Sequence, residues 1–208
     1  MFDELVKFFV VLLVVVEPLS VLPVLAGLTQ GAGDGYRRRM ACKAVAISVV
    51  VCLLFALAGT ALLAVLGISV DAFKVGGGIL LFLLAIEMVF ARPSGVRSIT
   101  PGENAEAHHR GDILVFPLAF PLISGPGALA VILLAFAGLP MASLQFVAQI
   151  GVIVLVLAIT LALMLMTGPV MRVVGVTGGA VLGRLLGVLL AALAAQFVMD
   201  GVRGAMSG

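Results

Sequence analysis

Charged residues are scarce in this chain, and their scarcity indicates its class. Only 11% of the 208 residues are Asp, Glu, Lys or Arg, while 63% are hydrophobic and the mean hydropathy is +1.33. A typical soluble domain is about 25% charged and about half apolar, so a soluble core could not bury this composition. The apolar runs are continuous and lack the alternation of a β-barrel strand. The sequence therefore predicts an all-α, polytopic membrane protein.

Signals for several other classes are also missing. Cys42 and Cys52 form no Cys-x-x-Cys pair, so redox or iron–sulfur chemistry has no support. The net charge of +2 gives no reason to expect nucleic-acid binding. Asp3 and Glu4 precede Lys7, unlike the basic start of a signal peptide, so this segment is expected in the mature fold. No nucleophile–base pair or metal-ligand spacing occurs in the apolar runs, so neither an enzyme nor a resident metal is expected.

Six apolar runs are each close to the ~20 residues that cross ~30 Å of hydrocarbon. The predicted spans are about Leu5–Leu28, Ala44–Leu66, Ala72–Phe90, Asp112–Ala137, Leu144–Met166 and Leu182–Met199. They divide the chain into a first three-helix repeat (1–91), a linker (92–111) and a second three-helix repeat (112–208). The adjacent His108 and His109 in the linker favour a solvated loop over a metal site.

Lys and Arg residues predict the orientation of the spans, because cytoplasmic loops carry an excess of both. Nine fall in the first, third and fifth loops: Arg37, Arg38, Arg39, Lys43, Arg92, Arg97, Arg110, Arg172 and Arg184. Three fall on the other side: Lys7, Lys74 and Arg203. The linker is therefore expected in the cytoplasm, and both termini outside, in the periplasm.

Two of the runs carry a pair of prolines at the same spacing. Pro18-Leu19-x-x-x-Pro23 matches Pro121-Leu122-x-x-x-Pro126 with an offset of 103 residues. A second match joins Gly78-Ile-Leu-Leu-x-x-Leu-Ala-x-Glu87 to Gly187-Val-Leu-Leu-x-x-Leu-Ala-x-Gln196 with an offset of 109. Each half holds three spans, so the halves insert in opposite orientations, as in the inverted repeats of secondary transporters. The first and fourth spans are predicted to be broken helices.

The broken spans combine features of a binding site. Proline removes backbone hydrogen bonds, and in a bilayer the freed groups must face the protein interior. Glycines allow close approach, a helix that starts at a proline favours an anion, and serine hydroxyls donate or accept. The predicted site for substrate and ion comprises Glu17, Pro18, Ser20, Pro23, Pro121, Ser124, Gly125, Pro126 and Gly127. The alternative is a pair of structural kinks.

Glu17 is the sharpest candidate, because it lies near the middle of its span. A carboxylate in the membrane is costly and marks a functional site by default. It could carry a coupling proton or pair with a cation such as Na⁺; the alternative is a protonated, structural hydrogen-bond donor. Its counterpart in the second motif is Phe120, so the site is asymmetric. Glu87, Gln196 and Asp200, near the ends of their spans, are secondary candidates.

At these residues the chain resembles the MarC family of bacterial inner-membrane proteins, also grouped as neutral amino acid transporters. The resemblance covers nearly the whole chain. It lies in the Pro-Leu-Ser-x-x-Pro stretch of the first run, Gly-Gly-Gly-Ile-Leu-Leu-Phe at 76–82, Phe-Pro-Leu-Ile-Ser-Gly-Pro-Gly-Ala at 120–128, Arg-Leu-Leu-Gly at 184–187 and Gln-Phe-Val-Met-Asp-Gly at 196–201. It implies six spans and, for some members, transport of small neutral amino acids. The residue before the first proline is often Asn or Asp in relatives, whereas here it is Glu17.

The leading hypothesis is a secondary transporter of a small zwitterion such as alanine or glycine, coupled to H⁺ or Na⁺ and working by alternating access. It would function in the lipid bilayer as a monomer or a homo-oligomer. One alternative is an exporter of divalent metal or another ion, with Glu17, Glu87 and Asp200 as oxygen ligands. Another is a membrane scaffold, which would tolerate polar substitutions at Ser20, Ser124 and Gly125.

Overall fold

A computed structural model of the chain describes residues 1–29, 31, 33–90 and 118–207, without the side chains of residues 176 and 177. The predicted linker, with His108 and His109, lies outside the described residues, as do residues 112–117 of the fourth predicted span. All the regular elements of the described residues are helices: α1 (Phe2–Val16), α2 (Pro18–Leu28), α3 (Asp34–Val65), α4 (Val70–Phe90), the π-helical η1 (Leu118–Ile123), α7 (Pro126–Phe136), α8 (Leu144–Leu165) and α9 (Thr167–Ser207).

Five helical segments in the described part of the chain are long and apolar enough to cross a membrane. They are Phe2–Leu28, Asp34–Val65, Val70–Phe90, Leu144–Leu165 and Gly178–Ser207. The all-α, polytopic prediction is therefore confirmed, but with five candidate spans instead of six. In the fourth predicted span, α7 has only 11 residues. At about 1.5 Å per residue it covers roughly half of the ~30 Å hydrocarbon layer.

Two helices extend well beyond their predicted apolar runs. Helix α3 begins at Asp34, ten residues before the predicted start at Ala44, and α9 begins at Thr167, fifteen before Leu182. Helical hydrogen bonds do not require apolar side chains, so a helix continues where the sequence turns polar. Helix α9 also changes direction at Gly175, where φ is 64° and ψ is 173°, a conformation that favours glycine.

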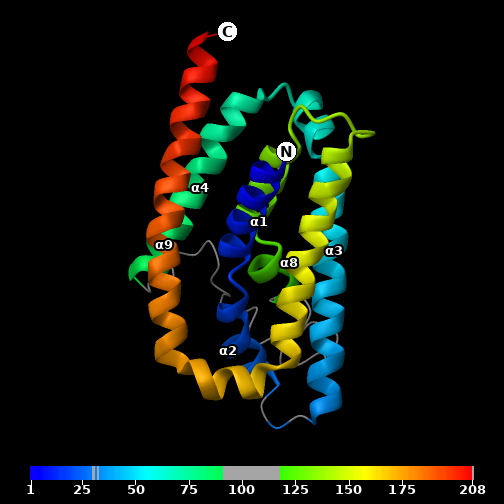
Figure 1. The fold of residues 1–208 in the computed structure, drawn as a ribbon, viewed down its shortest axis with the longest axis vertical. Coiled ribbons are helices and arrows are strands. Elements are labelled where there is room, and N and C mark those ends of the chain that lie inside the picture. The colour runs from blue at the N-terminus through cyan, green and yellow to red at the C-terminus, as the bar shows by residue number, and fades with distance from the viewer. Residues whose placement is uncertain (30, 32, 91–117, 208) are drawn as a thin grey trace.

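The helices form a bundle with both termini at the same end (Figure 1). Helices α1 and α2 lead away from that end, α3 returns and α4 leads away again, whereas α8 leads away and α9 returns. Helix α3 lies beside α8, and α4 packs along α9. Corresponding helices of the two halves are therefore neighbours that run in opposite directions.

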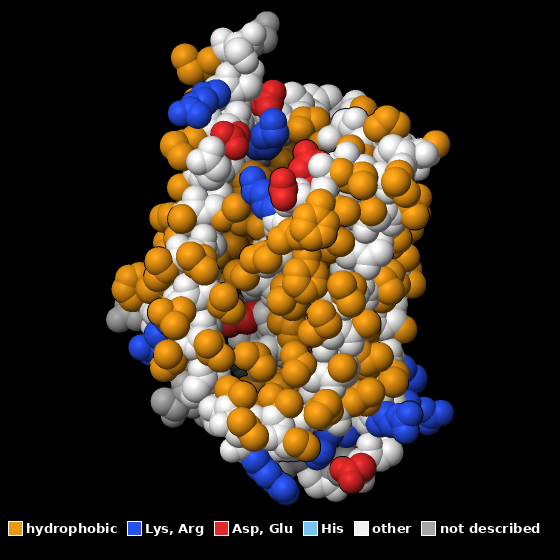
Figure 2. Space-filling model, viewed as in Figure 1, with side chains coloured by type: hydrophobic (Ala, Val, Ile, Leu, Met, Phe, Trp, Pro, Cys, Tyr) orange, Lys and Arg blue, Asp and Glu red, His pale blue; other side chains and the backbone are white. Residues whose placement is uncertain are grey.

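The surface has an apolar belt between two different ends (Figure 2). Large apolar side chains are exposed along the belt, among them Val50, Leu54 and Leu189 at 57%, 58% and 63%. At one end Lys and Arg clearly outnumber acidic side chains, whereas the other end carries both signs in similar amounts and includes the 2.7 Å ion pair of Lys74 with Asp71. A soluble protein would hide most of these apolar side chains, so the belt matches a lipid-facing surface.

Glycines bring α4 and α9 into backbone contact in a reciprocal way. A Cβ atom on Gly78 would lie 2.9 Å from the carbonyl oxygen of Ala194, and one on Gly187 would lie 3.2 Å from that of Ala85. Both Gly78 with Gly187 and Ala85 with Ala194 are 109 residues apart. Gly78 of α4 therefore packs against Ala194 of α9, and Gly187 of α9 packs against Ala85 of α4.

Candidate functional site

The first span is interrupted at a single residue, Glu17. Its φ of 48° and ψ of 63° are left-handed, and among the described residues it is the only non-glycine with positive φ. The Glu17 N–H donates to the Leu13 carbonyl at 3.0 Å, and its own carbonyl accepts from the Ser20 N–H at 3.0 Å. Pro18 has no N–H, so the hydrogen-bond ladder of α1 stops there. Glu17 thus ends α1 and caps the start of α2.

The Glu17 side chain lines a cavity of about 230 Å³ between the break and helices α8 and α9. Glu17 is 8% exposed, and its carboxylate is the only charged group among the lining residues. The rest of the wall is apolar apart from Gly183 of α9. A Cβ on Gly183 would lie 2.8 Å from Glu17 Oε1, so this glycine leaves room for the carboxylate.

Two helix ends meet at this cavity. The C-terminal end of α1 carries partial negative charge and the N-terminal end of α2 partial positive charge. Leu19, the second residue of α2, lines the cavity, and an N–H at this position has no acceptor within its own helix. The cavity thus combines a carboxylate, which suits a cation, with a helix start, which suits an anion.

The second interruption is closed by internal hydrogen bonds. It contains Phe120, with φ −138° and ψ 128°, and a cis Phe120–Pro121 peptide bond. The Ala119 carbonyl accepts from the Ser124 N–H at 2.9 Å and from Ser124 Oγ at 2.6 Å. Ser48 Oγ shares its proton between this carbonyl, at 3.3 Å, and the Ala44 carbonyl of its own helix, at 3.0 Å. Ser124 is fully buried. Its N–H and its hydroxyl therefore both satisfy a carbonyl that the break removes from the regular helical ladder.

The glycines and proline after Ser124 have packing reasons of their own. Gly125 caps α7 in an extended conformation, and a Cβ there would overlap the Pro121 carbonyl oxygen. Pro126 starts α7, where its missing N–H costs nothing. A Cβ on Gly127 would lie 3.1 Å from Val15 Cγ1, so this glycine lets α7 approach α1 closely.

The structure brings only part of the predicted site together. Glu17 and Pro18 line one cavity, whereas Ser20 and Pro23 are exposed on α2 and do not line it. Ser124 and its neighbours in the second motif do not line it either. The two motifs contact one another through the packing of α2 with η1 and of α1 with α7.

The secondary candidates lie away from this cavity. Glu87 is half-buried on α4. Gln196 Nε2 donates to Asp200 Oδ1 at 2.8 Å, and both residues are exposed towards the C-terminal end of α9. Within the described residues, no group of three or more His, Cys, Asp or Glu side chains could hold a metal ion.

Sequence reasoning missed two residues of these sites. Gly183 leaves space for the Glu17 carboxylate, because it has no Cβ atom there. Ser48 donates a hydrogen bond to the Ala119 carbonyl, 71 residues along the chain. Ser48 carried a signal, because it is a polar residue inside an apolar run. Gly183 carried none, because a glycine in a membrane helix is ordinary.

Comparison with known proteins identifies the family. The protein family described as "MarC family integral membrane protein" matches residues 2–206, which is nearly the whole chain. The chain belongs to the MarC family. Its MarC relatives include the UPF0056 inner membrane protein YhgN of Escherichia coli (strain K12), which is 32% identical over 211 residues, covering 99% of this chain and all of the relative.

Two further MarC relatives come from distant organisms. The UPF0056 membrane protein MJ1677 of Methanocaldococcus jannaschii is 34% identical over 192 residues, with 92% of both chains covered. The UPF0056 membrane protein YvbG of Bacillus subtilis is 30% identical over 204 residues, covering 98% of this chain and 96% of the relative. No solved structure matches the chain. The resemblance seen in the sequence motifs is therefore confirmed at the level of the family.

Proposed function

We propose that this MarC protein is a secondary transporter of small neutral amino acids such as alanine or glycine. Transport is coupled to H⁺ or Na⁺ and proceeds by alternating access in a bacterial inner membrane. The observation that carries the proposal is Glu17, a buried carboxylate at a helix break that lines an otherwise uncharged cavity. Ionisable groups inside a membrane bundle mark ion and substrate pathways.

The chemistry of the cavity supports a small zwitterion. The Glu17 carboxylate can accept hydrogen bonds from an ammonium group or a hydrated cation, and it can bind a proton. The start of α2, where Leu19 lines the cavity, favours a carboxylate. The cavity volume of about 230 Å³ lies below the ~300 Å³ at which pockets for drug-sized ligands begin. A substrate with a small side chain fits this volume.

An inverted repeat accounts for how the site would open to either side. The antiparallel placement of α3 beside α8 and α4 beside α9 supports it, as does the reciprocal packing of Gly78 and Gly187. Transporters of this plan rock one repeat against the other around a central site. With the basic end in the cytoplasm, both termini lie in the periplasm.

Counterflow in proteoliposomes tests the transport activity. Vesicles loaded with unlabelled alanine should accumulate labelled alanine or glycine, and an imposed pH or Na⁺ gradient should identify the coupling ion. The Glu17→Gln substitution keeps the side-chain size but removes the charge. We expect it to lower gradient-driven uptake at least tenfold.

A matched control and a clear negative result complete this test. Asp3→Asn makes the same chemical change at an exposed position of α1 and should leave uptake within about twofold of wild type. The proposal fails if folded wild-type protein catalyses no exchange of any small amino acid under either gradient. It also fails if Glu17→Gln transports as well as wild type.

Gly183 offers a second test of the cavity. A Cβ there would lie 2.8 Å from Glu17 Oε1, so Gly183→Ala should displace the carboxylate and reduce uptake while the protein remains folded. Shortening the acidic side chain should relieve this crowding. The double variant Gly183→Ala/Glu17→Asp should therefore transport faster than Gly183→Ala alone, and the absence of this rescue would disconnect Gly183 from the site.

Native Cys42 tests the orientation. It is exposed near the start of α3, at the end opposite the termini. A membrane-impermeant maleimide should label Cys42 only after inside-out vesicles are prepared. A cysteine introduced as Ser207→Cys, near the C-terminus, should react in intact spheroplasts, and the reverse pattern would invert the proposed topology.

A further inference from the structure

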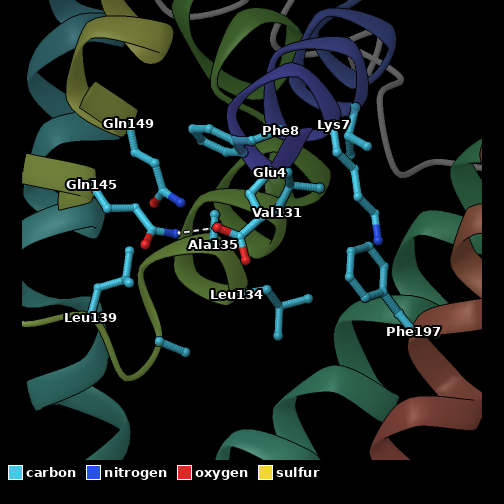
Figure 3. Close-up of a pocket in the computed structure, with 12 residues that line it drawn as sticks. Glu4, Lys7, Phe8, Val131, Leu134, Ala135, Leu139, Gln145, Gln149 and Phe197 are labelled. Carbon is cyan, nitrogen blue, oxygen red and sulfur yellow. Dashed lines mark hydrogen bonds between the residues drawn. The ribbon is translucent and has the colours of Figure 1, made fainter. Parts of the chain in front are cut away.

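A second cavity lies at the end of the bundle that holds the termini (Figure 3). Its volume is about 310 Å³, and its walls come from α1, α7, the segment after α7, α8 and α9. None of its lining residues lines the Glu17 cavity. Its polar groups are Glu4 and Lys7 from the first turns of α1, and Gln145 and Gln149 from the first turns of α8.

The inner wall of this cavity holds a buried hydrogen-bond acceptor, Oε1 of Gln149. Gln149 is only 4% exposed, and its Oε1 has no hydrogen-bond partner among the residues that the structure describes. Its side chain extends from α8 into the space beside Phe8 of α1 (Figure 3). A buried acceptor without a donor is unfavourable, so this oxygen is positioned to accept a hydrogen bond from a molecule bound in the cavity.

The mouth of the cavity presents charges of both signs. Glu4 Oε2 accepts a hydrogen bond from Gln145 Nε2 at 2.9 Å and lies 3.6 Å from the N-terminal ammonium group of Met1, and the Glu4 side chain is 63% exposed. Lys7 lies on the other side of the cavity from Gln145 (Figure 3) and makes no ion pair with any residue that the structure describes. Glu4 attracts a cationic group and Lys7 an anionic one.

We propose that this cavity is a second binding site, for a small molecule that carries both an ammonium group and an anionic group. The ammonium group enters between Glu4 and Gln149 and donates to Gln149 Oε1, and the anionic group pairs with Lys7. This site is distinct from the Glu17 site and goes beyond the transport proposed above.

Simpler occupants fit the cavity less well. One water molecule accounts for ~30 Å³ of liquid volume, far below the volume available here. A lone cation would meet the charge of Lys7, and a lone anion would meet that of Glu4. The required pair of groups occurs in a free amino acid and in the head group of phosphatidylethanolamine, so the test must separate these two sources.

The chain contains no tryptophan, so a single introduced indole reports on this cavity alone. Leu139 lines the cavity and is partly buried, so Leu139→Trp places the reporter at the site. Glycine and L-alanine, titrated into the protein in detergent, should change its fluorescence saturably. Methylamine and acetate, which each carry only one of the two groups, should bind at least tenfold more weakly.

Substitutions in the reporter protein connect binding to the named groups. Gln149→Leu removes the buried acceptor, and Lys7→Gln removes the positive charge; each should weaken glycine binding at least tenfold. Glu17→Gln should leave this titration unchanged, so a failure of the transport proposal is distinguishable from a failure of this one. If Leu139→Trp does not fold, the thermal shift of wild-type protein with glycine, compared with that of Gln149→Leu, replaces the fluorescence signal.

The lipid arm uses nanodiscs with and without phosphatidylethanolamine. A fluorescence change that needs this lipid and is lost in Gln149→Leu supports the same site with a lipid head group as its ligand. If neither glycine, alanine nor the lipid changes the signal, the proposal is overturned. It is overturned equally if Gln149→Leu binds glycine as tightly as the parent protein, since Gln149 would then hold only water.

Discussion

The two interrupted segments share a proline spacing but resolve their interruptions in opposite ways. At Glu17 the chain turns through one left-handed residue, and the side chain of that residue lines a cavity. At Phe120–Gly125 the chain folds its polar groups inward, where both polar groups of Ser124 donate to the Ala119 carbonyl. The first break places an ionisable side chain against a cavity, whereas the second buries its hydroxyl in a hydrogen bond to the backbone.

This difference teaches that a repeated motif does not require a repeated role. Glu17 aligns with Phe120, which is 39% exposed, whereas Glu17 is 8% exposed. Ser124 aligns with Val21 and not with Ser20, so the two hydroxyls are not equivalent either. The first break places its ionisable residue at a cavity, and the second provides a closely packed surface against α1 and α4.

The largest expected loss of stability tests how tightly the backbone packs at the second break. Gly125→Ala would place its Cβ on the Pro121 carbonyl oxygen, and backbone cannot move aside as a side chain can. Overpacking of this kind costs ~3 kcal/mol, so thermal unfolding in detergent should begin well below the wild-type temperature. Gly151→Ala, at an open position of α8, should instead be stabilising by ~0.5–1 kcal/mol. Equal stability of the two variants would show that the second break is not tightly packed.

The next largest loss of stability tests whether the two halves are structurally equivalent. The comparison of their two breaks depends on this equivalence. Gly78→Ala and Gly187→Ala both introduce a Cβ near a carbonyl of the facing helix. Each should be destabilising by ~1–3 kcal/mol, and by similar amounts in chemical unfolding. Gly76→Ala, on the open side of α4, serves as the control. A large loss for one glycine and none for the other would argue against this equivalence.

A smaller effect with the opposite sign is expected at the first break. A left-handed conformation costs a residue with a Cβ ~1–2 kcal/mol, so Glu17→Gly should raise the free energy of unfolding by about 1 kcal/mol while it abolishes uptake. Gly67→Ala, at a loop residue with φ 66°, should lower it by a similar amount. A Glu17→Gly variant that is less stable than wild type would favour a structural role for the carboxylate.

The smallest effect separates a structural Ser124 from one that binds substrate. The Ala119 carbonyl keeps two donors in Ser124→Ala, so the loss should be only ~0.5–1 kcal/mol, with uptake nearly unchanged. Ser48→Ala should cost less, because its bond to Ala119 is longer, at 3.3 Å against 2.6 Å. Loss of uptake without loss of stability in Ser124→Ala would instead assign Ser124 to the substrate site.

The sequence predicted the break at Glu17 and the extents of α4 and α8 to within two residues. These features follow from local rules, since proline ends a helical ladder and an apolar run of spanning length forms a helix. The length of α9 could not be predicted from these local rules, because the helix continues through residues that lie outside the apolar run. The short α7 did not follow either, because hydropathy does not reveal where within an apolar run a helix restarts.

The sites were less predictable than the helices. The carboxylate at residue 17 is conspicuous in an apolar run, so it could be found from sequence. Its neighbour Gly183 lies on another helix 166 residues later, and nothing local connects the two. Gln149 was overlooked, although a polar side chain within an apolar run is the same signal that identified Glu17.

The contact between α4 and α9 has a mechanical consequence. Two helices that touch through glycines approach at the level of their backbones, so there are few flexible side chains between them that could absorb a relative shift. Helices α4 and α9 are therefore expected to form a rigid pair within the bundle. In the transport cycle proposed above, movement of one half against the other would therefore have to pivot about this contact, with the largest displacements in the short, interrupted segments beside it. A crosslink between α4 and α9 should then slow uptake less than a crosslink between α1 and α7.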